Sequence, residues 1–184
     1  MTMEKPGTII IYVSEYEKGR KDSAELFREA AVRYAGPEAA RWTVRTGEKG
    51  KPYFQDVTHV HFNISHSGCY WMCAFSDRPV GLDVQKIGAT PRGRLAARFF
   101  HPGEVAYLEG MAEDAFYSVW AAKESFVKYT GTGIAGNFGA FSTVAENGVF
   151  PVAPNAEIRI GRWAEDYVFC LCAEVIRGVK IIEL

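Results

Sequence analysis

Long apolar runs are missing from this 184-residue sequence. A membrane-crossing helix needs about 18 or more consecutive apolar residues, and the short stretch Ile9–Val13 is also too short for the core of a signal peptide. An excess of charge of one sign is missing too, since 21 Lys and Arg residues accompany 22 Asp and Glu residues. These absences argue against a protein that spans a membrane or mainly coats nucleic acid without sequence preference.

Cysteine is scarce, and its four copies do not form a zinc-binding pattern. Cys69 and Cys73, like Cys170 and Cys172, lie at even spacing within apolar, aromatic runs. Structural zinc sites usually combine closely spaced cysteines with glycine or polar turns. We therefore predict buried free thiols and a reducing, cytoplasmic location.

The residues that are present have a globular composition, with 48% hydrophobic and 23% charged residues. Residue periodicity and turn signals predict strands over 7–14, 40–45, 59–64, 69–75, 80–85, 141–145, 156–163, 167–174 and 179–184, a polar turn over 65–68, and helices over 23–34, 92–100, 102–110 and 114–129. Each half thus starts with a strand, continues through helix and contains antiparallel strands. The pattern predicts an α+β fold of two similar lobes, residues 1–78 and 79–184, in one compact body.

The first candidate site is the hexapeptide Val80–Gln85. Its apolar residues alternate, so Asp83 and Gln85 share the opposite face of the predicted strand. Two neighbouring oxygen-bearing side chains suit Mg²⁺, which binds one or two carboxylates and keeps water or substrate phosphates as its other ligands. Taken alone, however, this hexapeptide is better explained as an amphipathic strand with a solvated face.

The second candidate site lies on the predicted helix over 114–129. Trp120, Glu124 and Lys128 follow one another at helical spacing and share one face, and Lys123 lies about 100° round the helix. The pattern suggests a second metal-binding carboxylate with ammonium groups that hold a phosphate. Taken alone, it is better explained as a surface Glu–Lys pair, which is worth only about 0.3–0.5 kcal/mol.

The third candidate site is the segment Asn63–Gly68, supported by the loop Gly50–Pro52. A turn rich in serine, glycine and backbone N–H donors, with His66 in it, suits a phosphate group. A hairpin turn with a structural histidine fits the same residues.

The order of these clusters is more informative than any one of them. The sequence contains ISHSG, then G-x-D-x-Q, then FF-x-x-x-E, then W-x-x-KE-x-x-x-K. This order resembles the 4'-phosphopantetheinyl transferase superfamily, and most closely the two-lobed type that activates nonribosomal peptide and polyketide synthases. The residues that match are 62–68, 74–75, 79–84, 98–100, 104 and 116–133.

The resemblance implies a specific reaction. The family transfers the 4'-phosphopantetheine arm of coenzyme A to a serine of an apo-carrier protein, acyl or peptidyl, requires Mg²⁺ and releases adenosine 3',5'-bisphosphate. It implies an active site in the cleft between two lobes of a monomer. Asp83 and Glu124 match the metal ligands, and Gln85 occupies a position where many members have a third acidic ligand. That departure removes one negative charge and is expected to weaken metal binding in the free enzyme.

The resemblance also implies which residues bind coenzyme A. Lys128 matches the lysine that contacts the phosphates, His66 and its neighbour Ser65 match the region near the 3'-phosphate, and Lys51 matches a contact of the nucleotide. Lys123 is expected to point at the same anion from the side. The first 45 residues depart most from the family, and the candidates there for binding the 3'-phosphate are Arg20, Lys21, Arg41 and Arg45.

The attack of the serine hydroxyl requires a general base. The resemblance points to Glu104, with Glu124 as the other candidate. Two further function classes remain compatible with the sequence. One is a noncatalytic module that binds coenzyme A or a carrier protein through a degenerate metal site, and the other is a metal-dependent phosphodiester hydrolase.

Overall fold

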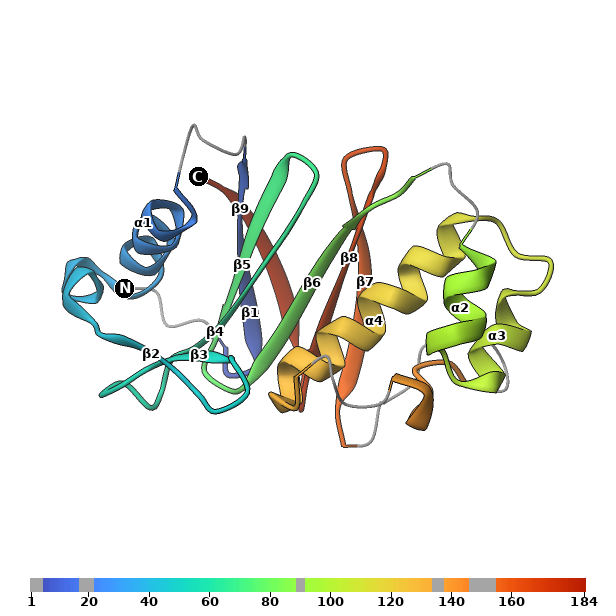
Figure 1. Cartoon of the computed structure of the whole chain (residues 1–184). Coiled ribbons are helices and arrows are strands. Elements are labelled where there is room, and N and C mark those ends of the chain that lie inside the picture. The colour runs from blue at the N-terminus through green and yellow to red at the C-terminus, as the bar shows by residue number, and fades with distance from the viewer. Residues whose placement is uncertain (1–4, 17–21, 89–91, 134–137, 146–154) are drawn as a thin grey trace.

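The structure is a computed structural model that describes residues 5–16, 22–88, 92–133, 138–145 and 155–184 (Figure 1). Its strands are β1 (Thr8–Glu15), β2 (Val44–Thr46), β3 (Pro52–Phe54), β4 (His61–Ser67), β5 (Tyr70–Ser76), β6 (Val80–Lys86), β7 (Glu157–Trp163), β8 (Tyr167–Ala173) and β9 (Gly178–Glu183). Its α-helices are α1 (Ser23–Ala35), α2 (Gly93–Phe99), α3 (Pro102–Leu108) and α4 (Asp114–Thr130), and the short 3₁₀ helices are η1 (Pro37–Arg41) and η2 (Phe138–Ala140). The mixed α and β architecture agrees with the predicted class.

Three local predictions are wrong, each for a local reason. The strand predicted over 40–45 is replaced by η1, because Pro37 fixes the start of a 3₁₀ turn, and only 44–46 form a strand. The turn predicted over 65–68 begins only at Gly68, whose φ of 56° is left-handed. Residues 141–145 are irregular, because Ser142 bonds to the backbone of Val144 instead of joining a ladder.

The first sheet has the strand order β4-β5-β1-β9 and is covered by α1. Asp22 caps α1 by accepting a hydrogen bond from the N–H of Ala24. The helix buries Leu26 and Ala30 against the sheet, within a cluster of aromatic rings that includes Phe62 and Phe75. In Figure 1 this layer forms one end of the molecule.

The second sheet has the order β6-β8-β7 and is covered by α4 (Figure 1). The helix backbone approaches β6 very closely at Gly81, where an added Cβ would lie 1.9 Å from the carbonyl oxygen of Ser125. Only glycine permits this approach. The G-x-D pattern of the sequence therefore brings β6 close to the helix that carries Glu124 and Lys128.

The two sheets share a core and meet where β4 lies beside β6. Ile9, Ile11 and Met72 of the first sheet pack with Leu82 and Leu171 of the second. The last strand, β9, pairs in parallel with β1, so the end of the described chain lies in the first sheet. The division into lobes at residues 78 and 79 stays a prediction.

Side chains of β4 provide hydrogen bonds to the backbone of β6. Three alternate residues accept bonds from three alternate N–H groups: Asn63 Oδ1 from Leu82, Ser65 Oγ from Val84 and Ser67 Oγ from Lys86, at 2.9, 3.2 and 2.9 Å. We call this set the β4–β6 seam. It satisfies N–H groups that a neighbouring strand would otherwise pair.

Two further predictions concern the state of the cysteine thiols and the absence of membrane-spanning helices. All four thiols are free, and Cys73, Cys170 and Cys172 are buried as predicted, whereas Cys69 is exposed at the β4–β5 turn. Among the described residues, no helix combines the length and apolar character that a membrane span requires.

Candidate active site

The centre of the candidate site is the carboxylate of Asp83 on β6. The ammonium of Lys128 lies 2.7 Å from Asp83 Oδ1 and also donates to Ser65 Oγ at 3.0 Å and to the carbonyl oxygen of Leu82. Ser65 Oγ donates to the same carboxylate oxygen at 2.9 Å. Asp83 is 3% exposed, and the alternation of β6 explains its position, because Leu82 and Val84 face the core.

Glu124 lies on α4 beside this group, one helical turn before Lys128. It is 6% exposed, and within the described parts of the chain its carboxylate has no hydrogen-bond or ion-pair partner. Burial and the neighbouring Asp83 carboxylate raise the pKa of Glu124 from 4.5 to about 7, against an opposing effect of Lys128. A buried, unpaired carboxylate beside a second one favours binding of a cation.

Gln85 shares the face of Asp83, as predicted from the alternation of β6. Its Nε2 donates to Asp83 Oδ2 at 2.7 Å. The described residues contain no group of three or more His, Cys, Asp or Glu side chains that is placed to hold a metal. Two carboxylates and one carboxamide nevertheless fit Mg²⁺, which leaves several positions to water and substrate phosphates. Asp83, Glu124 and Gln85 are therefore the residues that would hold it.

A cavity of about 310 Å³ borders this cluster. Glu124 and Lys128 of α4 lie on one side, and Asn63 and Ile64 of β4 on another. The remaining lining residues are Lys49, Gly50, Lys51, Pro52, Val127, Gly131 and Gly133. The cavity thus joins the loop that contains Gly50–Pro52 to the carboxylate cluster, two features that are far apart in the sequence.

Lys51 lines this cavity, but its ammonium is bonded to the backbone. Its Nζ donates to the carbonyl oxygen of Tyr129 at 2.7 Å and to that of Val80 at 3.3 Å. Burial lowers the pKa of Lys51 to about 8. Lys51 therefore ties the end of α4 to the start of β6, a role that its sequence position did not reveal.

His66 is exposed on β4, on the face opposite to its neighbours Ser65 and Ser67 of the seam. Its ring stacks on that of Tyr16, with centroids 5.6 Å apart and planes 22° apart. Tyr16, which sequence reasoning missed, gives His66 a fixed orientation. Of the predicted 3'-phosphate ligands, Arg20 and Lys21 lie outside the described residues, Arg41 is exposed, and Arg45 donates to Gln55 Oε1.

The structure argues against the predicted roles of Glu104 and Lys123. The two side chains form an ion pair of 2.7 Å, and both are 0% exposed. Glu104 also accepts bonds from the N–H of His101 and from the N–H and hydroxyl of Thr143, and Lys123 donates to the carbonyl oxygen of Phe141. A general base must reach the proton that it accepts, and an anion ligand must reach its anion. Neither group has that access.

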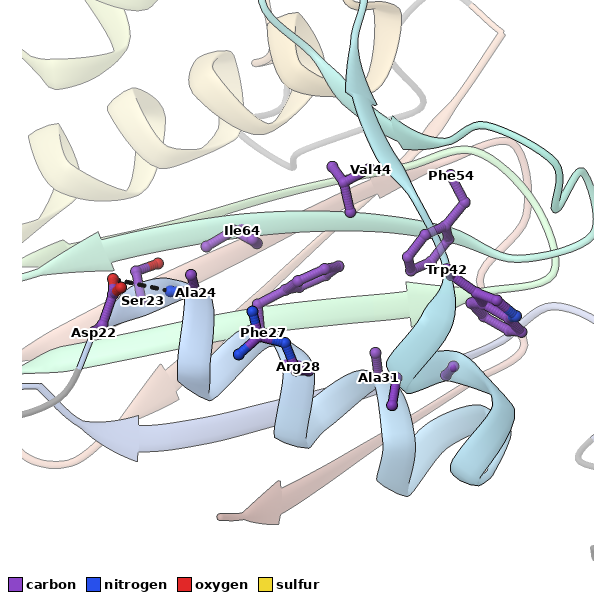
Figure 2. Close-up of a pocket in the computed structure, with 12 residues that line it drawn as sticks. Asp22, Ser23, Ala24, Phe27, Arg28, Ala31, Trp42, Val44, Phe54 and Ile64 are labelled. Carbon is purple, nitrogen blue, oxygen red and sulfur yellow. Dashed lines mark hydrogen bonds between the residues drawn. The ribbon is translucent and has the colours of Figure 1, made fainter.

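A second, larger hollow of about 600 Å³ lies between α1, η1, β2 and β4. Figure 2 shows Phe27, Trp42, Phe54 and Ile64 around it, with Asp22 and Ser23 at the N-terminus of α1. Ile64 lines both hollows, so the two adjoin at this residue, whereas no residue of the carboxylate cluster lines the larger one.

A buried pair of carboxylates with a lysine, at the junction of two sheets and beside an open cavity, defines a candidate metal-assisted phosphoryl-transfer site. The sequence comparisons agree with this class. The sequence model of the 4'-phosphopantetheinyl transferase superfamily matches residues 79–172. The chain therefore belongs to this superfamily, and the prediction of its family is confirmed.

Individual relatives bear the same name. The chain is 37% identical over 121 residues to a 4'-phosphopantetheinyl transferase of Bacillus subtilis, which covers 64% of this chain and 54% of the relative. It is 40% identical over 101 residues to 4'-phosphopantetheinyl transferase Sfp of Bacillus subtilis strain 168, covering 53% and 45%. With 4'-phosphopantetheinyl transferase gsp of Aneurinibacillus migulanus it shares 31% identity over 139 residues, covering 73% and 57%. The matches thus span about half the length of these curated relatives.

Proposed function

We propose that this protein transfers the 4'-phosphopantetheine arm of coenzyme A to a serine of an apo-carrier protein, acyl or peptidyl, in a reaction that requires Mg²⁺. One observation carries the proposal: Asp83, Glu124 and Lys128, which come from two elements, converge beside the cavity that the Gly50–Pro52 loop lines. Family membership supports the same reaction.

In the proposed reaction the serine oxygen attacks the β-phosphorus of coenzyme A. The bond from that phosphorus to the bridging oxygen breaks, and adenosine 3',5'-bisphosphate leaves with the bonding electrons. Mg²⁺, which Asp83, Glu124 and Gln85 would hold, would supply charge stabilisation to the reacting phosphates. The ammonium of Lys128, which is 26% exposed beside the cavity, stabilises the charge that develops on the leaving phosphate.

Glu124 is the carboxylate that we assign to accept the serine proton. It borders the cavity, so its carboxylate can come within hydrogen-bond reach of a serine hydroxyl that enters there. Both of its oxygens lack partners among the described residues, so one is available to the metal and the other to the proton. Glu104 lacks this access because it is enclosed in its pair with Lys123.

The test is a transfer assay read by intact mass. The protein is incubated with coenzyme A, Mg²⁺ and a panel of peptidyl, polyketide and fatty-acid apo-carrier proteins. At least one carrier is expected to gain the mass of one phosphopantetheine on serine, and chelation of the metal is expected to prevent the gain. No gain on any carrier, with coenzyme A intact, would refute the proposal.

One observation favours the noncatalytic alternative, a module that only binds coenzyme A or a carrier protein. Gln85 occupies Asp83 Oδ2 with its amide nitrogen and brings no negative charge to the metal position. Coenzyme A binding without transfer to any carrier would support this alternative. Release of free phosphopantetheine without a carrier would instead indicate a hydrolase.

The proposal also covers the oligomeric state and the location of the protein. We propose a monomer whose site lies in the cleft between two lobes, because the groups of the candidate site all come from one chain. Free thiols in the described fold support a reducing compartment such as the cytoplasm. Light scattering that shows an obligate trimer would contradict the monomer.

A further inference from the structure

Asn63 of β4 has a buried side-chain amide whose oxygen already accepts a hydrogen bond. Its Oδ1 accepts a hydrogen bond from the N–H of Leu82 at 2.9 Å, and the residue is only 4% exposed. An N–H donor requires an oxygen opposite it, so this bond fixes the orientation of the amide. The amide nitrogen, Nδ2, takes no part in this bond.

Nδ2 of Asn63 has no hydrogen-bond partner among the described residues. The only fully enclosed side-chain nitrogen or oxygen without a partner in that part of the chain is Trp163 Nε1, so Nδ2 keeps access to open space. That space is the 310 Å³ cavity, which Asn63 lines together with Glu124 and Lys128. In the free protein water can bond to this donor, and a ligand that enters the cavity must replace that water with an oxygen of its own.

The other members of the β4–β6 seam show that the seam itself does not require an asparagine. Ser65 and Ser67 accept the equivalent bonds from β6 with hydroxyl groups, at 3.2 and 2.9 Å. A hydroxyl thus reaches β6 from this face of β4. The extra feature that asparagine brings at position 63 is a second polar group, an N–H₂ donor on the cavity side.

We propose that Asn63 is a substrate-binding residue whose Nδ2 donates a hydrogen bond to an oxygen of coenzyme A in this cavity. The inference rests on the proposed function and adds a ligand to it. Its Oδ1 simultaneously holds Leu82, the neighbour of Asp83, so the same side chain couples the substrate to the strand that carries the central carboxylate.

Two substitutions separate the donor from the seam. Asn63→Ser reproduces the hydroxyl acceptor of positions 65 and 67, stays neutral and lacks Nδ2. Asn63→Asp keeps the shape and the acceptor oxygen but replaces the donor by a charged acceptor. Ser67→Ala is the matched control, because it removes a seam bond to Lys86 that lies away from the cavity lining. Thermal unfolding checks that all three variants are folded.

The measurement is the Kd of coenzyme A, by calorimetry with Mg²⁺ present. Asn63→Ser is expected to raise Kd about tenfold, as for a lost hydrogen bond to a charged or strongly polar oxygen, and Asn63→Asp at least as much. Ser67→Ala is expected to leave Kd unchanged. Adenosine 3',5'-bisphosphate as a second ligand locates the acceptor: an equal loss places it on the nucleotide, and no loss places it on the diphosphate or the arm.

Three results would overturn the inference. Wild-type affinity in Asn63→Ser would remove the donor role, and so would a loss confined to Asn63→Asp, because repulsion by the new charge then explains it. An equal loss in Ser67→Ala would show that only the seam matters. Failure of the wild-type protein to bind coenzyme A is a different result, since it would refute the proposed function.

Discussion

Helix α4 carries two ion pairs of the same length in very different surroundings. Lys123 meets Glu104, and Lys128 meets Asp83, each at 2.7 Å. The first pair is fully enclosed, with the rings of Phe138 and Phe141 around the ammonium, and further hydrogen bonds satisfy its carboxylate. In the second pair the lysine is 26% exposed and borders a cavity.

The difference separates a pair that is closed to ligands from one that a ligand can reach. In the enclosed pair, both the carboxylate and the ammonium are bonded to other groups of the protein. The pair therefore links α3, α4 and the segment near Thr143, and no ligand can reach it. The open pair has the partnerless carboxylate of Glu124 beside it and therefore a charge that a cation would stabilise. The distance between nitrogen and oxygen is the same in the two pairs, so it is the access of solvent and ligands that distinguishes them.

The largest expected effect concerns activity at the open pair. Asp83→Asn is expected to lower the transfer rate by about a thousandfold, because it removes a metal ligand worth several kcal/mol. The free energy of unfolding is expected to fall by only about 1 kcal/mol, since the asparagine oxygen still accepts bonds from Ser65 and Lys128 and only the bond from Gln85 is lost. The mass assay measures the rate, and Asp114→Asn, which alters an exposed pair with Arg162, is the control. A near wild-type rate would mean that Asp83 holds the structure together and does not bind the metal.

The second prediction concerns stability at the enclosed pair. Lys123→Met is expected to lower the free energy of unfolding by about 3–5 kcal/mol, because it leaves the carboxylate of Glu104 buried and unpaired. Lys128→Met is expected to lower it by about 1 kcal/mol, since Lys128 is partly exposed beside the cavity and water can take the place of its ammonium. Urea unfolding measures both variants. Equal losses of free energy of unfolding would show that the two pairs stabilise the fold to the same extent.

The third prediction is a pH dependence at Glu124. Its pKa is about 7 in the folded protein, above its ordinary 4.5, so ionising it costs folding stability as pH rises through this window. Glu124→Gln should therefore raise Tm by a few degrees at pH 8 and leave it nearly unchanged at pH 4.5. Calorimetric scans at both pH values test this. An increase of the same size at pH 4.5 would rule out titration of Glu124 as the cause.

The smallest expected effect concerns the metal at Gln85. Gln85→Glu adds a negative charge beside Asp83 and Glu124, so the variant is expected to need roughly 2–10-fold less Mg²⁺ for half-maximal thermal stabilisation. Thermal unfolding across a magnesium titration measures this without any turnover. If the variant needs more metal than the wild type, position 85 does not face the ion.

Sequence reasoning succeeded where one element determines the arrangement. Alternation in β6 placed Asp83 and Gln85 on one face, and the hydrogen bond between them confirms it. Helical spacing likewise placed Glu124 and Lys128 one turn apart on α4. The prediction of a turn over residues 65–68 was wrong. Serine hydroxyls favour turns locally, but here those of Ser65 and Ser67 accept hydrogen bonds from β6, and the strand β4 continues to Ser67.

Periodicity and the order of the motifs along the chain indicated the family and the strands and helices that carry the motifs. The assignment of Asp83, Glu124 and Gln85 to a metal stays a prediction. Only the tertiary structure decided which charged residue of each motif faces the cavity. Lys123 and Glu124 are neighbours, yet helical geometry turns them about 100° apart, one toward Glu104 and the other toward Asp83. The partner of each is set by packing between distant segments, and no pattern of local spacing encodes it.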